Sequence, residues 1–384
     1  MSEVFEINDV SQLAGIRADW DSLLGQTANA TFFQTLDWLE IYWKHNGQGQ
    51  RLRVVVVRED DQTVGIVPLA VRPEPTRAGR LRALTFPLHG WGSFYGPIGP
   101  APEKSLGLAL KHVRQTRRDW DVIELRWVHP EDADAGRIER AFQSAGLEAD
   151  REMPQQTAVV DLTGTWDSYL ASRTSKWRNN YRRWERRLAE RGTVRYLRHR
   201  PGIGGDPRWD LYEACETIAS HSWQTVANDT SGTTLTHDSI RGYLREMHQV
   251  AAALGSVEMN LLYLNEKPLA FAYNYVHQGS IYGLRVGYDP AVAQDGAGNL
   301  LYAFAIRDSF ERGDRIYDMG PGSLGAKHNL LTRILPIHRY DHFHPTALRA
   351  QLVRLKRRLA AKALGTGVAE TGAPPAPSAV STPA

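Results

Sequence analysis

The same order of secondary-structure signals occurs twice in this chain of 384 residues. Amphipathic helices come first, β-branched strands joined by short turns follow, and a further helix and strand end each unit. In the first half these signals cover residues 11–26, 35–45, 52–57, 64–71, 104–117, 121–127, 138–144 and 157–162, with an irregular segment over 81–102. In the second half they cover residues 166–191, 193–197, 209–222, 237–254, 258–264, 269–277, 280–288, 299–312, 315–319 and 334–343. No repeat is visible residue by residue, so the order alone suggests a duplication.

Composition excludes several classes of protein. Hydrophobic residues make up 42% and charged residues 23%, which is typical of a globular chain and excludes a fibrous or wholly disordered one. The longest apolar run, residues 300–306, is too short to span a membrane, and the acidic residues 1–9 do not resemble a secretory signal. One cysteine, Cys215, excludes an intrachain disulfide and a cysteine-rich zinc site. We therefore expect a cytoplasmic protein, and a net charge of +3 does not imply an extended nucleic-acid surface.

A glycine-bearing loop joins a strand to a helix near residue 290. Val286, Gly287 and Tyr288 end the strand signal, and Gly296, Gly298 and Asn299 stand where the helix begins. The first turn of a helix presents unpaired N–H groups, and glycine lets a ligand approach the backbone, so this pattern fits a pyrophosphate-bearing cofactor. A flexible loop with Asn299 near a helix start explains the same residues, and both interpretations stay open.

An acidic residue ends an otherwise apolar strand in the sequence Ile-Tyr-Asp-Met-Gly-Pro-Gly at 316–322. The strand period of two places Tyr317 and Asp318 on opposite faces. Asp318 beside a glycine turn is a candidate general base or substrate anchor, and a structural Asp that caps the turn is the alternative. Lys327 and His328 follow, and they either neutralise a phosphate or carboxylate or lie on the surface.

A basic helix is predicted around residues 173–191. Its apolar stripe is Trp177, Tyr181, Trp184 and Leu188, and its flanking cations are Arg178, Arg182, Arg183, Arg186 and Arg187. Packing of the stripe with solvation by the arginines explains the pattern, and a basic face for a phosphorylated sugar, a lipid headgroup or RNA is the alternative. His342 and His344 have no carboxylate nearby except Asp341, so we expect no metal site.

Five landmarks in order over about residues 168–344 carry a family resemblance. They are Thr-Ser-Lys-Trp-Arg-Asn-Asn-Tyr-Arg-Arg at 174–183, Ser222-Trp223, Leu-Tyr-Leu-Asn-Glu-Lys-Pro-Leu-Ala at 262–270, Tyr288-Asp289-Pro290 with Gly296 and Gly298, and Tyr317-Asp318-Met319-Gly320 with Lys327. Together they resemble the acetyltransferase domain of CelD-type proteins of cellulose biosynthesis. That branch of the GNAT superfamily is close to the FemAB-like peptidyltransferases.

The resemblance implies a mixed α/β fold with largely antiparallel sheets, built as tandem GNAT-like domains of which the C-terminal one is better formed. The expected parts are a degenerate GNAT-like domain over 1–155, a GNAT acyltransferase domain over 156–345, a basic C-terminal helix over 346–364 and a disordered tail over 365–384. The tail is rich in Gly, Ala, Pro, Ser and Thr and lacks the apolar surface that folding requires.

The resemblance also implies an N- or O-acyltransferase that moves an acyl group from acyl-CoA to an amine or hydroxyl of a cell-envelope or exopolysaccharide-related acceptor. Asp318 is then the candidate base, Tyr288 or Tyr317 the proton donor to the thiolate, and a backbone N–H near residues 286–288 the oxyanion donor. The expected cofactor-binding residues are Val286, Gly287, Gly296, Gly298 and Asn299, and the expected substrate-binding residues are Lys176, Arg178, Arg182, Trp223 and Lys327.

Two alternatives remain. One is FemAB-like transfer from an aminoacyl-tRNA, and the other is a non-catalytic GNAT-like scaffold in polysaccharide assembly. The acceptor, the acyl group, the donor and the oligomeric state stay open.

Overall fold

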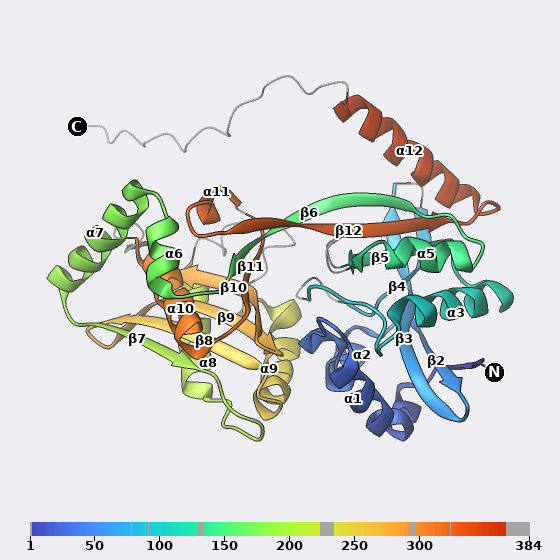
Figure 1. Cartoon of the computed structure of the whole chain (residues 1–384), viewed down its shortest axis with the longest axis horizontal. Coiled ribbons are helices and arrows are strands. Elements are labelled where there is room, and N and C mark those ends of the chain that lie inside the picture. The colour runs from blue at the N-terminus through green and yellow to red at the C-terminus, as the bar shows by residue number, and fades with distance from the viewer. Residues whose placement is uncertain are drawn as a thin grey trace.

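The chain folds into two lobes that share one sheet of twelve strands (Figure 1). The computed structural model describes residues 2–77, 79–88, 90, 92–128, 134–222, 234–291, 296–322 and 324–365, with side chains to residue 359. The strands are β1 Ser2–Ile7, β2 Arg51–Glu59, β3 Gln62–Thr76, β4 Gly79–Thr85, β5 Val122–Val128, β6 Asp150–Asp161, β7 Val194–His199, β8 Val257–Leu264, β9 Lys267–His277, β10 Ser280–Tyr288, β11 Ile316–Pro321 and β12 Arg333–Phe343. Their order in the sheet is β1-β2-β3-β4-β5-β12-β6-β11-β10-β9-β8-β7.

This order is a palindrome in which β1 to β6 correspond to β7 to β12. Most neighbouring strands are antiparallel, and one parallel pair occurs in each half, β4 with β5 and β10 with β11. The mixed α/β fold with a largely antiparallel sheet and a tandem GNAT-like arrangement is thereby confirmed.

The helices occupy corresponding places in the two halves. They are η1 Val10–Ile16, α1 Arg17–Gln26, η2 Phe32–Gln34, α2 Leu36–Asn46, α3 Pro102–Gln115, α5 Arg137–Ser144, α6 Trp166–Ser172, α7 Ser175–Arg191, α8 Trp209–His221, α9 Asp238–Ala253, α10 Ala297–Arg312, α11 Leu324–Lys327 and α12 Leu348–Gly365. Thus α1 and α2 precede β2 as α8 and α9 precede β8, and α3 joins β4 to β5 as α10 joins β10 to β11.

The two halves exchange their last strands. β12 lies between β5 and β6, and β6 pairs with β11 of the C-terminal half, with Asp318 opposite Val159. Figure 1 shows these two long strands crossing from one lobe to the other. The predicted domain boundary after residue 155 falls inside β6.

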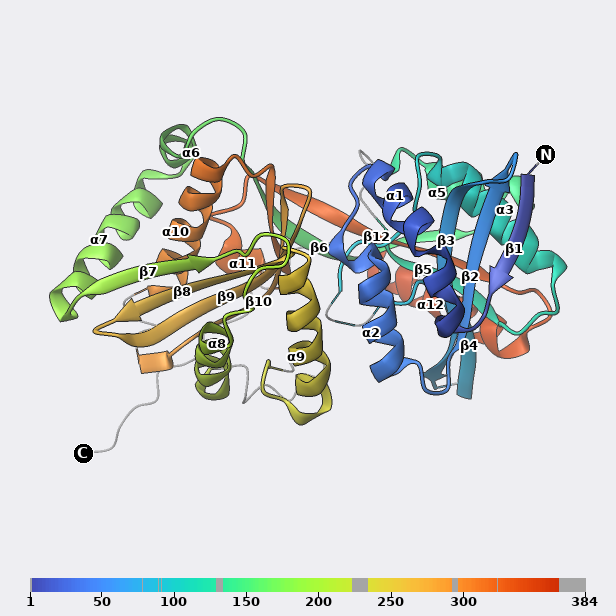
Figure 2. The same ribbon diagram turned by 90° about the horizontal axis from the view of Figure 1, so that it is seen from below.

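Aromatic side chains join the lobes on the side opposite β6 and β12. Phe32 and Phe33 from η2 pack against Tyr275 of β9, with ring centroids 4.5 and 5.7 Å apart. Beside them α2 faces α9 (Figure 2), and Glu246 of α9 pairs with Lys44 at 2.6 Å. The lobes are therefore held together by both an apolar and a polar contact.

Three expectations about elements were wrong. The single helix over 166–191 is two helices, because Arg173 is extended and the side chain of Thr174 accepts from the backbone N–H of Trp177 to start α7. The segment over 81–102, which was predicted to be irregular, contains most of β4, and β4 pairs with β3 over its whole length. The strand β1 was missed, since its short sequence Ser-Glu-Val-Phe-Glu-Ile shows no strand alternation, and only pairing along the edge of β2 makes it a strand. Of the predicted tail over 365–384, Gly365 ends α12, and the remaining residues lie outside the described residues.

Candidate functional site

The parallel strands β10 and β11 separate after three residues. Their pairing runs from Ser280–Ile316 to Tyr282–Asp318, and β10 then continues with β9 through an irregularity between Gly283 and Arg285. A Cβ on Gly283 would lie 2.9 Å from the carbonyl oxygen of Asp318, so glycine is required for the close approach just before the strands part. The resulting gap exposes the edge of β10 to a ligand.

A cavity of about 810 Å³ opens at this gap. The C-terminal half contributes Gly283, Leu284, Arg285, Pro321, Gly322 and Leu324 to its wall. The exchanged strand β6 contributes Met153, Pro154, Gln155 and Gln156, and the N-terminal half contributes Gly90, Gly92, Ser93 and Trp127. The cavity is thus built jointly by both halves, and it is large enough for a small-molecule substrate.

Asp318 is buried three residues before Pro321 of the cavity wall and is not itself among the residues that line the cavity. Its carboxylate accepts hydrogen bonds from the hydroxyl of Thr157 and, at 2.8 Å, from the backbone N–H of Gly320. Burial raises the pKa of Asp318 to about 6, because it outweighs these hydrogen bonds and the charge of Lys327. A carboxyl group that titrates near neutrality is suited to proton transfer, and its bond to Gly320 also gives it the structural role in the turn.

Lys327 is the last residue of α11 and holds the same turn. Its Nζ donates to the carbonyl oxygens of Gly320 at 2.7 Å and Pro321 at 3.2 Å. Burial lowers the pKa of Lys327 to about 8, and the nearby charge of Asp318 opposes that shift. His328 is exposed. The structure therefore brings Asp318 and Lys327 together around one glycine turn at the edge of the cavity.

The predicted cofactor-binding residues gather where β10 ends and α10 begins. Gly298 lies in the first turn of α10 with an ordinary φ, and a Cβ there would lie 3.0 Å from the ring of Tyr288. Gly296 is the N-cap with φ +74°, and its added Cβ would lie 2.4 Å from the ring of Trp184 on α7. Gly296 is thus required by backbone conformation and by packing, whereas Gly298 and Asn299 are partly exposed.

The other two members of that set have packing contacts. Val286 packs on the C-terminal core, and a Cβ on Gly287 would lie 2.5 Å from the ring of Phe271. Residues 292–295 of the predicted loop lie outside the described residues.

Tyr317 points away from the cavity into the core. It is completely buried, and its hydroxyl accepts from Asn274 at 2.9 Å. Asn274 also donates to Glu258, which pairs with Arg198 and Arg200. Burial raises the pKa of Tyr317 well above its ordinary value. The structure therefore places Tyr317 in a buried polar network and separates it from Asp318, as the strand period predicts.

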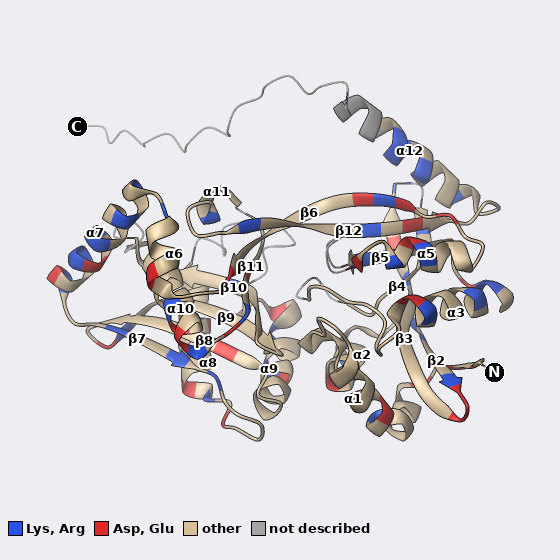
Figure 3. Cartoon of the chain, in the orientation of Figure 1, with Lys and Arg blue, Asp and Glu red and all other residues tan. Residues whose placement is uncertain are grey.

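The predicted substrate-binding residues of α7 do not line the cavity. Lys176 and Arg182 are exposed on the outer side of the C-terminal lobe, where Figure 3 shows a row of cations along α7. Arg178 donates from Nη1 to the carbonyl oxygens of Ala171 and Arg173, at 2.8 and 2.6 Å, and so links α7 to the end of α6. Trp223 lies outside the described residues.

Sequence reasoning missed two polar residues of the site. Thr157 holds Asp318, and Arg285 lies in the cavity wall with its pKa lowered to about 10 by burial, so that it stays charged at neutral pH. Arg285 had one signal, a lone cation within an otherwise apolar strand. Thr157 had none, because only the exchange of β6 brings it next to β11.

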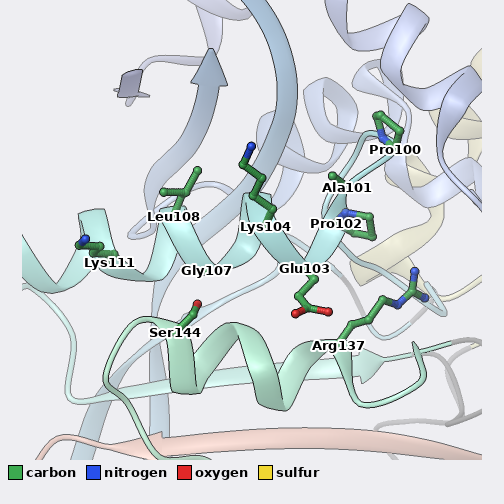
Figure 4. A pocket seen from close by; sticks show the side chains of 10 residues that line it. All are labelled: Pro100, Ala101, Pro102, Glu103, Lys104, Gly107, Leu108, Lys111, Arg137 and Ser144. Atoms are coloured by element: carbon green, nitrogen blue, oxygen red, sulfur yellow. The ribbon is translucent and has the colours of Figure 1, made fainter. Parts of the chain in front are cut away.

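A second cavity, of about 540 Å³, lies on the outer face of the N-terminal lobe between α3 and α5 (Figure 4). Two of its charged residues are already paired, with Glu103 bound to Arg140 at 2.7 Å and Lys104 to Glu59. Among the described residues, no group of three or more His, Cys, Asp or Glu could hold a metal ion. In the same part of the chain, no helix is both long and apolar enough to cross a membrane.

The comparisons with known proteins agree with this fold. Residues 175–328 match the model of the acetyltransferase (GNAT) domain family, so the C-terminal half carries a GNAT domain. That range begins with α7 and contains Tyr288, Gly298, Asp318 and Lys327. The resemblance to the GNAT superfamily is confirmed, and the CelD-type branch within it stays a prediction.

Two solved structures share the architecture over both halves. FemX matches with a TM-score of 0.62 and 14% identity, over 91% of this chain and 99% of that one. The C-terminal domain of a putative lysylphosphatidylglycerol synthetase from Agrobacterium fabrum matches with a TM-score of 0.51 and 12% identity, over 88% and 95%. At such identities the likeness shows the fold alone. No curated protein matches the chain.

Proposed function

We propose that this protein is an acyltransferase that moves an acyl group from acyl-CoA to an amine or hydroxyl of a cell-envelope or exopolysaccharide-related acceptor. The observation that carries the proposal is the cavity at the gap between β10 and β11 of the GNAT domain, with Asp318 buried behind the turn that contributes Pro321 and Gly322 to its wall. The gap exposes the backbone of β10 to the acyl-CoA, and the cavity lets the acceptor reach the same place.

The acyl-CoA side fits the end of β10 and the start of α10. The first turn of α10 contains no acidic residue, and its N–H groups lie at the positive end of the helix. Gly298 and Asn299 are partly exposed there, so a pyrophosphate could approach the backbone. A thioester supplies an activated acyl group, which needs no covalent enzyme intermediate.

The chemistry then follows from the chain's own groups. A backbone N–H at the end of β10, near residues 286–288, would stabilise the oxygen that gains negative charge as the acceptor attacks. Asp318 accepts the proton that the acceptor loses. Tyr288, which is partly exposed at the end of β10, returns a proton to the departing thiolate, whereas the buried hydroxyl of Tyr317 is bound to Asn274.

The acceptor side of the cavity favours an anionic molecule. Arg285 is the charged residue in its wall, and a partly buried guanidinium binds a carboxylate or phosphate more strongly than an exposed one. The remaining polar wall residues, Gln155, Gln156 and Ser93, are neutral donors and acceptors suited to sugar or peptide groups.

Transfer from an aminoacyl-tRNA is the second candidate. The observation that favours it is the match to FemX over both halves of the chain rather than over the GNAT domain alone. Under this alternative Asp318 and the cavity keep their roles, and the exposed arginines of α7 would contact RNA phosphates.

Calorimetric titration of the whole chain with acetyl-CoA and with charged tRNA separates these candidates. We expect binding of acetyl-CoA with one site per chain, and release of free thiol when a suitable acceptor is added. Binding of charged tRNA alone would favour the second candidate. Binding of neither would favour a non-catalytic scaffold and contradict the proposal.

A further inference from the structure

The C-terminal helix α12 is attached to the protein through its charged side. Arg354 donates to Asp150 at 2.8 Å, and Arg357 donates to Asp341 at 2.8 Å and to Glu124 at 3.1 Å. Ala350 and Val353, on the same side, pack on a small apolar cluster with Phe343. These contacts orient α12 on the sheet and leave its opposite face outward.

That outward face is a stripe of leucines. Leu348, Leu352, Leu355 and Leu359 are between 56% and 79% exposed. At 3.6 residues per turn they fall within an arc of about 60°. A surface helix normally buries its apolar stripe and exposes its charges, so α12 is inverted, and its leucines are available to something outside the described chain.

Exposed cations border this leucine stripe on both sides. Arg349 and Lys356 lie along one flank, and Arg358, which also pairs with Asp150 at 3.1 Å, lies along the other. Residues 348–365 contain no Asp or Glu, and Figure 3 shows only basic colour on the described part of the helix. Two copies of such a helix would bring like charges together, whereas an anionic surface would complement them.

We propose that α12 docks the protein on an anionic lipid surface, with the leucine stripe in the interface and the flanking cations against the headgroups. Apolar burial and electrostatic attraction then act together, which is what stable attachment of an interfacial helix requires. This goes beyond the proposed transfer reaction, because the docking surface shares no residue with the candidate site.

The position of the cavity is consistent with lipid docking. Met153 lines the cavity and is 52% exposed, and it lies on β6. Figure 1 shows β6, β12, α11 and α12 along the same upper side of the molecule. A bilayer that bound α12 would therefore lie on the side of the molecule where the exchanged strands β6 and β12 lie.

Cosedimentation of the full chain with vesicles tests this proposal. The vesicles are phosphatidylcholine with or without phosphatidylglycerol, and light scattering on the same proteins without vesicles gives the oligomeric state. We expect binding that requires phosphatidylglycerol and weakens with salt. The double variant Leu352→Gln and Leu355→Gln should bind about 100-fold more weakly, and Lys356→Glu about tenfold more weakly.

Matched controls lie elsewhere on the surface. Ile203→Gln removes an isoleucine that is 91% exposed, and Arg183→Glu reverses an exposed cation on α7, so neither should change vesicle binding. All four variants should melt within a few degrees of the parent, since the altered side chains are exposed. Unchanged vesicle binding in the leucine variant would overturn the proposal. So would a dimer that this variant dissociates, or an acidic protein partner with no affinity for vesicles.

Discussion

The two halves of the chain have the same strand order and differ at the point where their parallel strands part. In the N-terminal half β4 and β5 pair over two residues, Ala83–Val122 and Leu84–Ile123. The space beyond them is only about 80 Å³, with Phe86, Leu88 and Trp127 in its wall, whereas the gap of the C-terminal half opens into about 810 Å³. The topology therefore provides the gap, and the side chains decide whether a ligand can use it.

An acid of each half is buried near its gap, Glu124 on β5 and Asp318 on β11, and the pKa values of these two acids are shifted in opposite directions. Glu124 on β5 is buried, but the charges of Arg126, Arg339 and Arg357 outweigh that burial and hold its pKa below the ordinary value. Burial of Asp318 is not offset in this way, and its pKa rises to about 6. The N-terminal acid is an anchor in an ion-pair cluster, and the C-terminal acid is a group that can exchange a proton.

The helices that follow the two gaps also differ in the charge of their first turns. α3 begins with Pro102 and Glu103, so that an acidic side chain stands in its first turn. α10 begins with Ala297 and Gly298 and has no acid there. A negative side chain at a helix start already uses the favourable field that a phosphate would occupy. Only the C-terminal helix start is suited to a phosphate-bearing ligand.

The largest expected difference is in the stability of two variants, one at each buried acid. Glu124→Gln should lower the free energy of unfolding by about 2 kcal/mol, because it removes a buried carboxylate that accepts charged hydrogen bonds. Arg126, Arg339 and Arg357 keep other acidic partners, which limits the loss. Asp318→Asn should cause no loss at pH 7. The folded-state pKa of Asp318 is raised, so its stabilising contribution is present at low pH and is lost as pH rises through about 6. Denaturant titration of both variants checks this, and equal losses would show that the two acids are equivalent.

The same two variants should also differ in kcat. Asp318→Asn keeps the shape and removes the charge, so it should lower kcat about 100-fold and leave acyl-CoA affinity unchanged. Glu124→Gln should leave kcat within about twofold of the parent at a temperature where it is folded. Thiol release under saturating acyl-CoA measures both. Full activity in Asp318→Asn would reduce Asp318 to a residue that caps the turn.

The pH dependence of kcat/KM should report the same carboxyl group. A base must be deprotonated to act, so the rate should fall about tenfold per pH unit below about 6, the raised pKa of Asp318. Asp318→Asn should lose this limb and keep the rest of the profile. A limb that persists in the variant would assign it to another group.

A smaller difference is expected in the KM of two variants, each of which removes an arginine from the wall of one cavity. Arg285→Gln should raise the KM for an anionic acceptor about tenfold without changing acyl-CoA affinity, since the charge lies in the larger cavity. Arg72→Gln alters the wall of the small N-terminal cavity and is the matched control. Equal KM values in the two variants would exclude Arg285 from acceptor binding.

Local patterns were sufficient to predict most of the fold and part of the site. The landmarks at 286–299 and 317–327 identified the strand end, the helix start and Asp318, because they are contiguous in sequence. Thr157 and the cavity wall from β6 could not be predicted, since strand exchange places them by a long-range pairing. Tyr317 and Arg178 were selected by residue type, and only packing shows that their polar groups bind Asn274 and the end of α6.

The central claim is that acyl-CoA binds at the C-terminal gap and not at its N-terminal counterpart. Valine at the second residue of each helix start tests this by calorimetric titration with acetyl-CoA, with Gly298→Val in α10 and Glu103→Val in α3 as the matched control. We expect one acetyl-CoA site per chain. Its affinity should be at least about tenfold weaker in Gly298→Val, with a loss of folding stability of about 1 kcal/mol or less. The affinity should be unchanged in Glu103→Val. Unchanged affinity in Gly298→Val, or weakened affinity in Glu103→Val, would contradict the central claim.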